Sequence, residues 1–236
     1  MKTVLHKAAT RGHAAHGWLD SWHTFSFANY HDPARMHFGV LRVLNDDTVA
    51  PGMGFGRHPH DNMEIISIPL EGDLEHQDST GTKQVIRQGD VQVMSAGTGI
   101  THSEKNASSQ APVKFLQIWV FPKERNVPPR YDQQTFADAQ LQNKLIIVVS
   151  PVGDTDGVHI HQDAWFSLGH LEKGTGLTYD IKKKGNGVYA FVLEGDVFIN
   201  DIYLNRRDGL GISDTEQLTI KSDSNTKLLL MEVPMN

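Results

Sequence analysis

Short apolar or alternating segments, separated by clusters of Gly, Asp, Asn and Pro, recur along the whole chain. Hardly any segment keeps the 3.6-residue period of an amphipathic helix, so the pattern predicts a protein built mainly from β-strands. In the first half we expect strands at Val40–Leu44, Met63–Pro69, Leu74–Gln77, Gln84–Arg87, Val91–Met94 and Lys114–Phe121. In the second half we expect them at Leu145–Val149, Phe166–Leu171, Leu177–Ile181, Val188–Leu193, Val197–Ile199, Gln217–Ile220 and Lys227–Glu232. The pattern therefore predicts two all-β units.

A proline-rich stretch separates the two series of strands. Pro122, Pro128 and Pro129 fall close together, and proline lacks the N–H group that a central strand needs for its hydrogen-bond ladder. This stretch therefore predicts a connection. We place the boundary here, with one domain at residues 1–125 and a second at residues 126–236.

A short turn sequence occurs once in each half. The segment Leu70–Asp73 (LEGD) returns as Leu193–Asp196 at an offset of 123 residues, each time between two apolar strands. A looser similarity relates Gly89–Val91 to Arg207–Gly209 at an offset of 118 residues. Gly-Asp turns are common in β proteins, so chance stays an alternative. The two similarities together favour duplication of one unit.

Composition and charge exclude several classes of protein. The 236 residues include no Cys, which excludes disulfides, thiolate metal sites and Cys nucleophiles. The 22 Lys and Arg residues against 28 Asp and Glu residues give a net charge of −6, which argues against direct binding of nucleic acid. No apolar stretch approaches the roughly 18 residues of a membrane span, and the first residues lack the apolar run of a signal peptide. We expect no membrane partner and a cytoplasmic location.

The first half contains two pairs of side chains with metal-ligand chemistry. His58 and His60 are two residues apart, and so are His102 and Glu104. Residues i and i+2 of a strand face the same side, so two strands meeting across a barrel would present three imidazoles and one carboxylate to one point. Such a set suits a divalent transition metal, because imidazole nitrogen and carboxylate oxygen are borderline-to-hard ligands. An ion with five or six ligands would keep open positions for a substrate or dioxygen.

A structural role remains the alternative for these histidines. Among 13 His residues some pairs fall two apart by chance, and a His in a strand often only packs or forms hydrogen bonds. His159 and His161 have the same spacing, yet no second ligand pair is placed to serve them. The spacing alone therefore does not establish a metal site.

Aromatic residues and histidines are concentrated in the segment Trp18–Tyr30. A box of side chains that stack on a ligand is one interpretation, but large aromatic side chains dominate core burial in most proteins. We therefore expect this segment to seal the faces of a barrel, with His23 and His31 in structural roles.

Two motifs around the candidate ligands resemble those of cupins. The segment Gly52–Glu64, written G-x5-H-x-H-x3-E, is similar to the first cupin motif, and Gly89–Asn106 is similar to a modified second motif. Ser95, followed by a longer spacer, stands where cupins often have Pro, and with the segment His102–Glu104 this departure is typical of the pirin branch of two-barrel cupins. Further stretches that resemble pirins are Arg11–His13, Gly17–Tyr30, Met63–Ile65 and Met94–Ile100.

The resemblance implies a bicupin: an all-β fold of two tandem jelly-roll-type cupin barrels. It also implies a ligand set, consisting of His58, His60, His102 and Glu104. In many other cupins the glutamate of the first motif binds the metal, so Glu64 is the rival carboxylate.

The resemblance further implies one metal-binding barrel and one that has lost its ligands. Moved by the repeat offsets, the four ligand positions fall on Ile181, Lys183, Ile220 and Ser222. We therefore expect one divalent transition metal per chain, in the first barrel. Fe²⁺ is our choice, although Zn, Mn, Co, Ni and Cu would accept the same ligands.

Bacterial pirin-like proteins resemble quercetin 2,3-dioxygenases. The resemblance implies a metal-dependent dioxygenase that cleaves a flavonol such as quercetin with O₂, in which Glu104 acts as the general base. The alternative is an iron-dependent, redox-sensing regulatory protein that binds a protein partner without turnover. A third interpretation is a different cupin enzyme, such as an isomerase or another ring-cleaving oxygenase. We expect a monomer in either of the first two cases.

Overall fold

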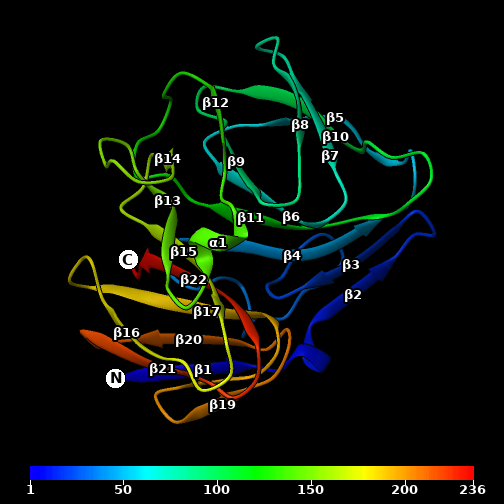
Figure 1. Cartoon of the computed structure of the whole chain (residues 1–236). Helices are drawn as coiled ribbons and strands as arrows, with labels where there is room; N and C mark the ends of the chain where they lie inside the picture. Colours follow the sequence, from blue (N-terminus) through cyan, green and yellow to red (C-terminus); the bar gives the residue numbers. More distant parts are fainter.

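The first barrel combines a seven-stranded and a four-stranded sheet. The computed structural model describes all residues 1–236. The seven-stranded sheet contains, in spatial order, β12 (Arg130–Thr135), β9 (Asp90–Ser95), β6 (Glu64–Glu71), β11 (Val113–Val120), β4 (Leu41–Val49), β3 (Leu19–His23) and β2 (Gly12–Ala15). The four-stranded sheet contains β5 (Gly54–His60), β10 (Ile100–Asn106), β7 (Leu74–Asp78) and β8 (Lys83–Ile86). Figure 1 shows this barrel in the upper half of the molecule.

The second barrel has the same composition of sheets. Its seven-stranded sheet contains β1 (Lys2–His6), β20 (Gly209–Ser213), β17 (Asn186–Glu194), β22 (Thr226–Pro234), β15 (Trp165–Leu171), β13 (Ile146–Pro151) and β14 (Val158–Ile160). Its four-stranded sheet contains β16 (Gly176–Asp180), β21 (Gln217–Ser222), β18 (Val197–Ile199) and β19 (Ile202–Leu204). The helical elements are short, η1 (Ala8–Thr10) and α1 (Asp138–Leu141). The predicted all-β, two-barrel fold is confirmed.

The two barrels repeat one arrangement of strands. The four-stranded sheets have the orders β5-β10-β7-β8 and β16-β21-β18-β19, in which each strand of the first has its counterpart in the second. The two similar turns also have matching backbones, because Gly72 and Gly195 both have φ at 75°. Glycine tolerates this left-handed conformation without the penalty of a side chain. Strand order and turn geometry thus support the predicted duplication.

One edge strand of each barrel comes from the other side of the predicted boundary. Strand β1, at the start of the chain, pairs with β20 from Lys2 opposite Ser213 to His6 opposite Gly209, and lies among the strands of the second half in Figure 1. Strand β12 follows the proline-rich connection but pairs with β9 of the first barrel. β1 and β12 therefore each belong to the barrel on the other side of residue 125. For the other strands the division at residue 125 stays a prediction.

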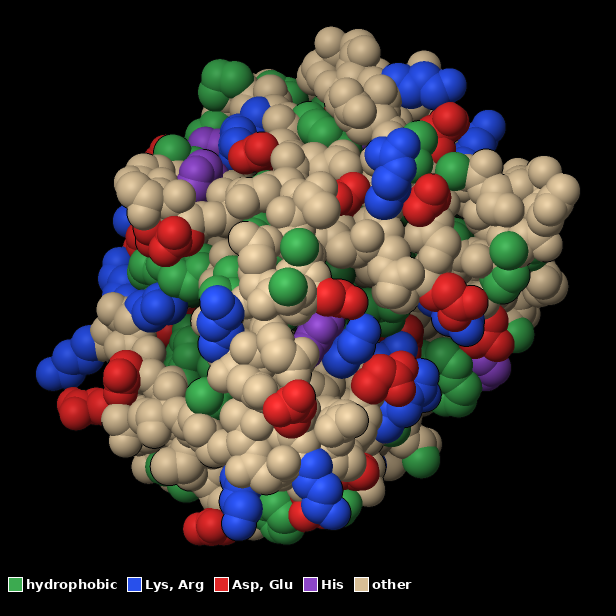
Figure 2. Space-filling view, in the orientation of Figure 1, with side chains coloured by type: hydrophobic (Ala, Val, Ile, Leu, Met, Phe, Trp, Pro, Cys, Tyr) green, Lys and Arg blue, Asp and Glu red, His purple; other side chains and the backbone are tan.

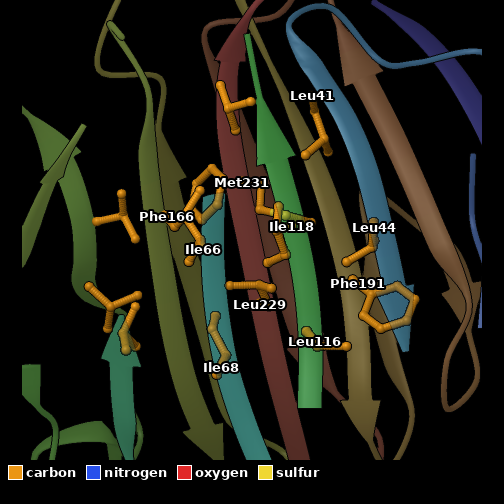
Figure 3. Close-up of a cluster of buried hydrophobic side chains, with 14 of the residues drawn as sticks. Leu41, Leu44, Ile66, Ile68, Leu116, Ile118, Phe166, Phe191, Leu229 and Met231 are labelled. Carbon is orange, nitrogen blue, oxygen red and sulfur yellow. The ribbon is translucent and has the colours of Figure 1, made fainter. Parts of the chain in front are cut away.

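The two seven-stranded sheets stack on each other through a shared apolar core. This core contains 26 buried side chains drawn from both halves of the chain. In Figure 3, Ile66 and Leu116 of the first barrel lie beside Phe166, Leu229 and Met231 of the second. Burial of apolar surface contributes about 25 cal/mol per Å², so the contact between the barrels is a main source of stability.

The interiors of the two barrels differ in polarity. A cluster of 14 buried apolar side chains fills the second barrel, and it includes Ile220, with Ile181 packed against it. The first barrel contains only clusters of five and four such side chains, which leaves room for polar groups inside. Ile181 and Ile220 occupy the positions in the second half that correspond to His58 and His102 in the first. We therefore keep the prediction that the second barrel binds no metal.

The surface shows no large block of one charge on the face in Figure 2, where Lys and Arg lie among Asp and Glu. The structure contains no helix with the length and apolarity that a membrane crossing requires. The expected lack of nucleic-acid binding and the cytoplasmic location remain predictions.

Candidate metal centre

Three of the four predicted ligands meet at one point in the first barrel. Strands β5 and β10 are hydrogen-bonded neighbours, with His102 directly opposite His58. The pairing corrects our expectation of two strands facing each other across the barrel. The Nε2 atoms of His58 and His102 are 3.0 Å apart. His60 joins them, so that ligand nitrogens of the three residues lie within 4.8 Å of one another.

Hydrogen bonds assign the protons of two of these imidazoles. Nδ1 of His58 donates to the Gly56 carbonyl at 2.7 Å, which leaves a lone pair on Nε2. His76 Nε2 donates to Asp78 Oδ2 at 3.0 Å, so His76 Nδ1 is an acceptor. His76 Nδ1 faces Nδ1 of His102 at 3.5 Å. This contact assigns the proton to His102 Nδ1. The Nε2 atom of His102 likewise keeps its lone pair.

The donor set fits a metal ion. Two imidazole nitrogens that face each other at 3.0 Å need a cation between or beside them, which is either a shared proton or a metal ion. Imidazole nitrogens bind Zn²⁺ at about 2.0–2.1 Å, so two such ligands at right angles lie roughly 3 Å apart. The spacing of His58 and His102 thus matches adjacent ligands of one divalent ion.

The electrostatic environment keeps the imidazoles in their ligand form. Burial, with a further contribution from His58, lowers the pKa of His60 to about 4. The same two causes, followed by His60 and His76, lower the pKa of His102 to about 2. A neutral imidazole is the form that binds a metal, so both residues are ready to do so at neutral pH.

Glu104 lies next to the three histidines but forms a second group. Its ligand oxygen lies within 4.8 Å of nitrogens of His76 and His102. Ser67 Oγ donates to Oε1 at 2.9 Å and Gln117 Nε2 donates to Oε2 at 2.7 Å. Burial raises the pKa of Glu104 to about 7 in spite of these hydrogen bonds. His102 belongs to both groups, the one with His58 and His60 and the one with His76 and Glu104. The four predicted ligands are therefore neighbours, but their ligand atoms do not all lie within 4.8 Å of one another.

The sequence analysis missed the side chains that support the ligands. His76 and Asp78 are two apart on β7, the spacing that drew attention to the other pairs. Ser67 and Gln117 each interrupt an apolar strand, which is a signal of an inward polar role. Only the pairing of β7 and β11 with distant strands brings these residues to the site.

The rival carboxylate and the second histidine pair lie away from both groups. Glu64 is buried, accepts a hydrogen bond from Ser95 Oγ at 2.7 Å and lies 3.4 Å from His161 Nδ1. His159 contacts Ser150 Oγ at 3.2 Å. Glu64 and His161 thus connect the two barrels, and none of these residues belongs to a candidate ligand group.

A cavity of about 320 Å³ opens beside the metal centre. Its walls include the candidate ligands His58, His60 and Glu104, together with Phe27 and Trp119. Trp119 lies edge-to-face against His60, with ring centroids 5.0 Å apart, and against Phe27 at 5.4 Å. The cavity is therefore apolar over most of its surface and suited to an aromatic molecule.

The segment Trp18–Tyr30 does more than seal the barrel. Phe25 lies in the core between the barrels, as expected for a sealing residue. Phe27 and His23, in contrast, line the cavity at the metal centre. His31 is exposed. The expected structural role of His23 therefore leaves out its position in the wall of the cavity.

Comparisons with known proteins identify the family of the chain. The family model "Pirin" matches residues 4–120, and the model "Quercetinase C-terminal cupin domain" matches residues 147–233. The chain is 46% identical over 230 residues to the quercetin 2,3-dioxygenase of Escherichia coli (strain K12), covering 98% of each protein. It is 40% identical over 222 residues to the pirin-like protein of Caulobacter vibrioides, covering 94% of this chain and 95% of the relative. The crystal structure of the bacterial pirin YhhW from Escherichia coli in complex with nickel(II) matches with a TM-score of 0.93 and 45% identity over 99% of both chains. The chain therefore belongs to the pirin family of two-barrel cupins.

Proposed function

We propose that this protein is a metal-dependent dioxygenase that cleaves a flavonol such as quercetin with O₂. The observation that carries the proposal is the pair of imidazole lone pairs on His58 and His102, 3.0 Å apart at a cavity with aromatic walls. The names of the relatives from Escherichia coli support the same reaction class. The apolar cavity beside the ligands favours a small molecule over the alternative of a redox-dependent protein partner.

The proposal assigns one Fe²⁺ per chain to His58, His60, His102 and Glu104. When bound, a divalent ion supplies Lewis acidity to a hydroxyl oxygen and a centre at which O₂ reacts. Zn, Mn, Co, Ni or Cu would fit the same donors.

The side chains around the ion prepare the substrate. A carboxylate that detaches from the ion can act as a general base toward the substrate, and in the metal-free protein burial favours protonation of Glu104 by raising its pKa to about 7. Glu104 would therefore accept the proton of the flavonol hydroxyl, while Ser67 and Gln117 hold its carboxylate in place. Phe27 and Trp119 exclude water and pack on the flavonol rings.

The test compares two histidine substitutions of the same kind. His58→Ala removes a proposed ligand, whereas His159→Ala removes a histidine outside the cavity. We expect His58→Ala to lose stoichiometric metal, measured by elemental analysis, and to lose O₂ uptake with quercetin in an oxygen electrode. His159→Ala should keep both. Wild-type protein that binds metal but consumes no O₂ with quercetin would contradict the proposal.

A further inference from the structure

A row of buried polar side chains crosses the inner face of the first seven-stranded sheet. Strand pairing places His23 opposite Asn45, Asn45 opposite Gln117, and Gln117 opposite Ser67. All four residues are less than one-tenth exposed. Ser67 and Gln117 hold Glu104 by hydrogen bonds. The row therefore begins at the metal centre and ends at His23.

Three polar atoms on residues around the cavity have no hydrogen-bond partner. They are Nδ1 of His23, Oδ1 of Asn45 and Nε1 of Trp119, and all three residues line the cavity. A buried polar atom without a partner destabilises the folded state, and native proteins contain few of them. Three of the seven such atoms in the chain belong to residues around this one cavity. Each is almost without accessible surface, so a ligand that supplies the missing partners reaches them by a small rotation of these side chains.

The hydrogen bonds of His23 fix what that ligand must offer. Ser21 Oγ donates its only proton to Asp47. Nε2 of His23, 2.8 Å from the same oxygen, must therefore act as donor. Burial, followed by the nearby charges of His13 and His16, lowers the pKa of His23, which keeps the ring neutral. Its free Nδ1 is thus an acceptor and calls for an N–H or O–H group of the ligand.

The distance between the two ends of the row sets the size of the ligand. His23 lies two strands away from Gln117, and neighbouring strands are about 4.8 Å apart, so the span is roughly 10 Å. A molecule that reaches both the metal centre and His23 must be longer than one aromatic ring. Phe27 and Trp119, edge-to-face at 5.4 Å, line the space between these ends.

We propose that His23 and Asn45 recognise a hydroxyl group of the substrate remote from the hydroxyl at the metal centre. Their free Nδ1 and Oδ1 atoms accept hydrogen bonds from a polyhydroxylated aromatic substrate, and Trp119 Nε1 donates to one of its oxygens. The inference rests on the proposed function and adds a substrate preference to it. The affinity of the protein for a flavonol depends on the remote hydroxyl groups as well as on the hydroxyl group at the metal.

The experiment compares two flavonols under O₂-free conditions. Quercetin carries several hydroxyl groups remote from its 3-hydroxyl, whereas 3-hydroxyflavone carries only the 3-hydroxyl. Dissociation constants for the metal-loaded protein are measured by quenching of tryptophan fluorescence. One neutral hydrogen bond changes affinity by about three- to tenfold. We expect His23→Phe and Asn45→Ser each to weaken quercetin by about that factor and to leave 3-hydroxyflavone nearly unchanged. Thr24→Val is the matched control, because it removes a buried hydroxyl that also has no partner but lies outside the cavity.

The outcomes separate this inference from the proposed function. The inference is overturned if both variants weaken the two flavonols equally, if neither variant changes the preference for quercetin, or if wild-type protein binds neither flavonol. O₂ uptake with quercetin in air is measured independently. If the variants weaken quercetin selectively but wild type takes up no O₂, the hydroxyl recognition is supported and the dioxygenase proposal is contradicted. If wild type takes up O₂ but binding does not depend on the remote hydroxyl groups, the dioxygenase proposal is supported and the hydroxyl recognition is contradicted.

Discussion

At the scale of single residues, a chain of polar contacts behind His102 orients it toward the candidate metal centre. Asp78 accepts a hydrogen bond from His76 Nε2 at 3.0 Å, and His76 Nδ1 in turn faces His102 Nδ1 at 3.5 Å. Such outer partners fix the tautomer of a metal-binding histidine, and their loss lowers metal affinity by about 10- to 100-fold. We expect His76→Phe, which keeps a buried ring, to weaken metal binding by that factor in a competition titration with a chelator.

A control for this prediction comes from the other oxygen of the same carboxylate. Thr80 donates to Asp78 Oδ1 through its backbone and its hydroxyl group, and neither bond involves His76. Thr80→Ala should therefore leave the metal affinity nearly unchanged. Equal affinities for wild type and His76→Phe would show that His102 is held by its strand alone.

A second residue-scale prediction concerns Asp47 and pH. Burial raises its pKa from the usual 3.8 to about 7, although Ser21 donates a hydrogen bond to it. Between these two pKa values the carboxyl group of Asp47 has lost its proton in the unfolded chain but still holds it in the folded chain. The contribution of Asp47 to stability therefore falls as pH rises. The expected slope is about 1.4 kcal/mol per pH unit.

Asp47→Asn should remove this part of the pH dependence. The measurement is urea unfolding of metal-free protein between pH 5 and 8, where the unfolding free energy of wild type relative to the variant should fall by about 1.4 kcal/mol per pH unit up to pH 7. Asp20→Asn, a change at a carboxylate that is half exposed, should keep the wild-type slope. Parallel curves for wild type and Asp47→Asn would mean that Asp47 is already ionised in the folded state.

The residues of the site differ in how far the sequence reveals them. His58 and His60 are recognisable as histidines two apart on a strand, and His102 by the same spacing to Glu104; the structure brings the three histidines together. His23 and Asn45 carry no such signal, since their role depends on which strands become neighbours. That register comes from packing over the whole sheet, which a local pattern of residues does not encode.

At the scale of elements, apolar alternation predicts a strand only where its inner face is apolar. The central part of β17, Val188–Leu193, is a continuous apolar run because both of its faces are buried, and it was predicted as a strand. Strand β4 was expected to end at Leu44 but continues to Val49, since Asn45 and Asp47 point into a polar interior. Strands β1 and β12 were missed for a related reason: each lies at the edge of a sheet, and few of its side chains are buried. Exposed edge strands such as β1 and β12 therefore escape a prediction based on apolar residues.

At the scale of the whole molecule, we expect the two barrels to unfold as one unit. The core of 26 side chains belongs to both halves, and the edge strands β1 and β12 each complete a barrel from across the boundary. A ligand that binds only the folded state stabilises whatever unfolds together with its site. A metal ion in the first barrel should therefore stabilise the second barrel as well.

Hydrogen exchange measured by mass spectrometry tests this coupling. At a free metal concentration about 100 times the dissociation constant, global opening should become roughly 100-fold rarer. We expect the slowest amides of β17 and β22, in the second barrel, to be protected by the same factor as those of β6 and β11 beside the metal centre. His58→Ala should show no added protection in either barrel. Protection confined to β6 and β11 would mean that the apolar contact in Figure 3 opens before either barrel unfolds, and that the second barrel folds independently of the metal.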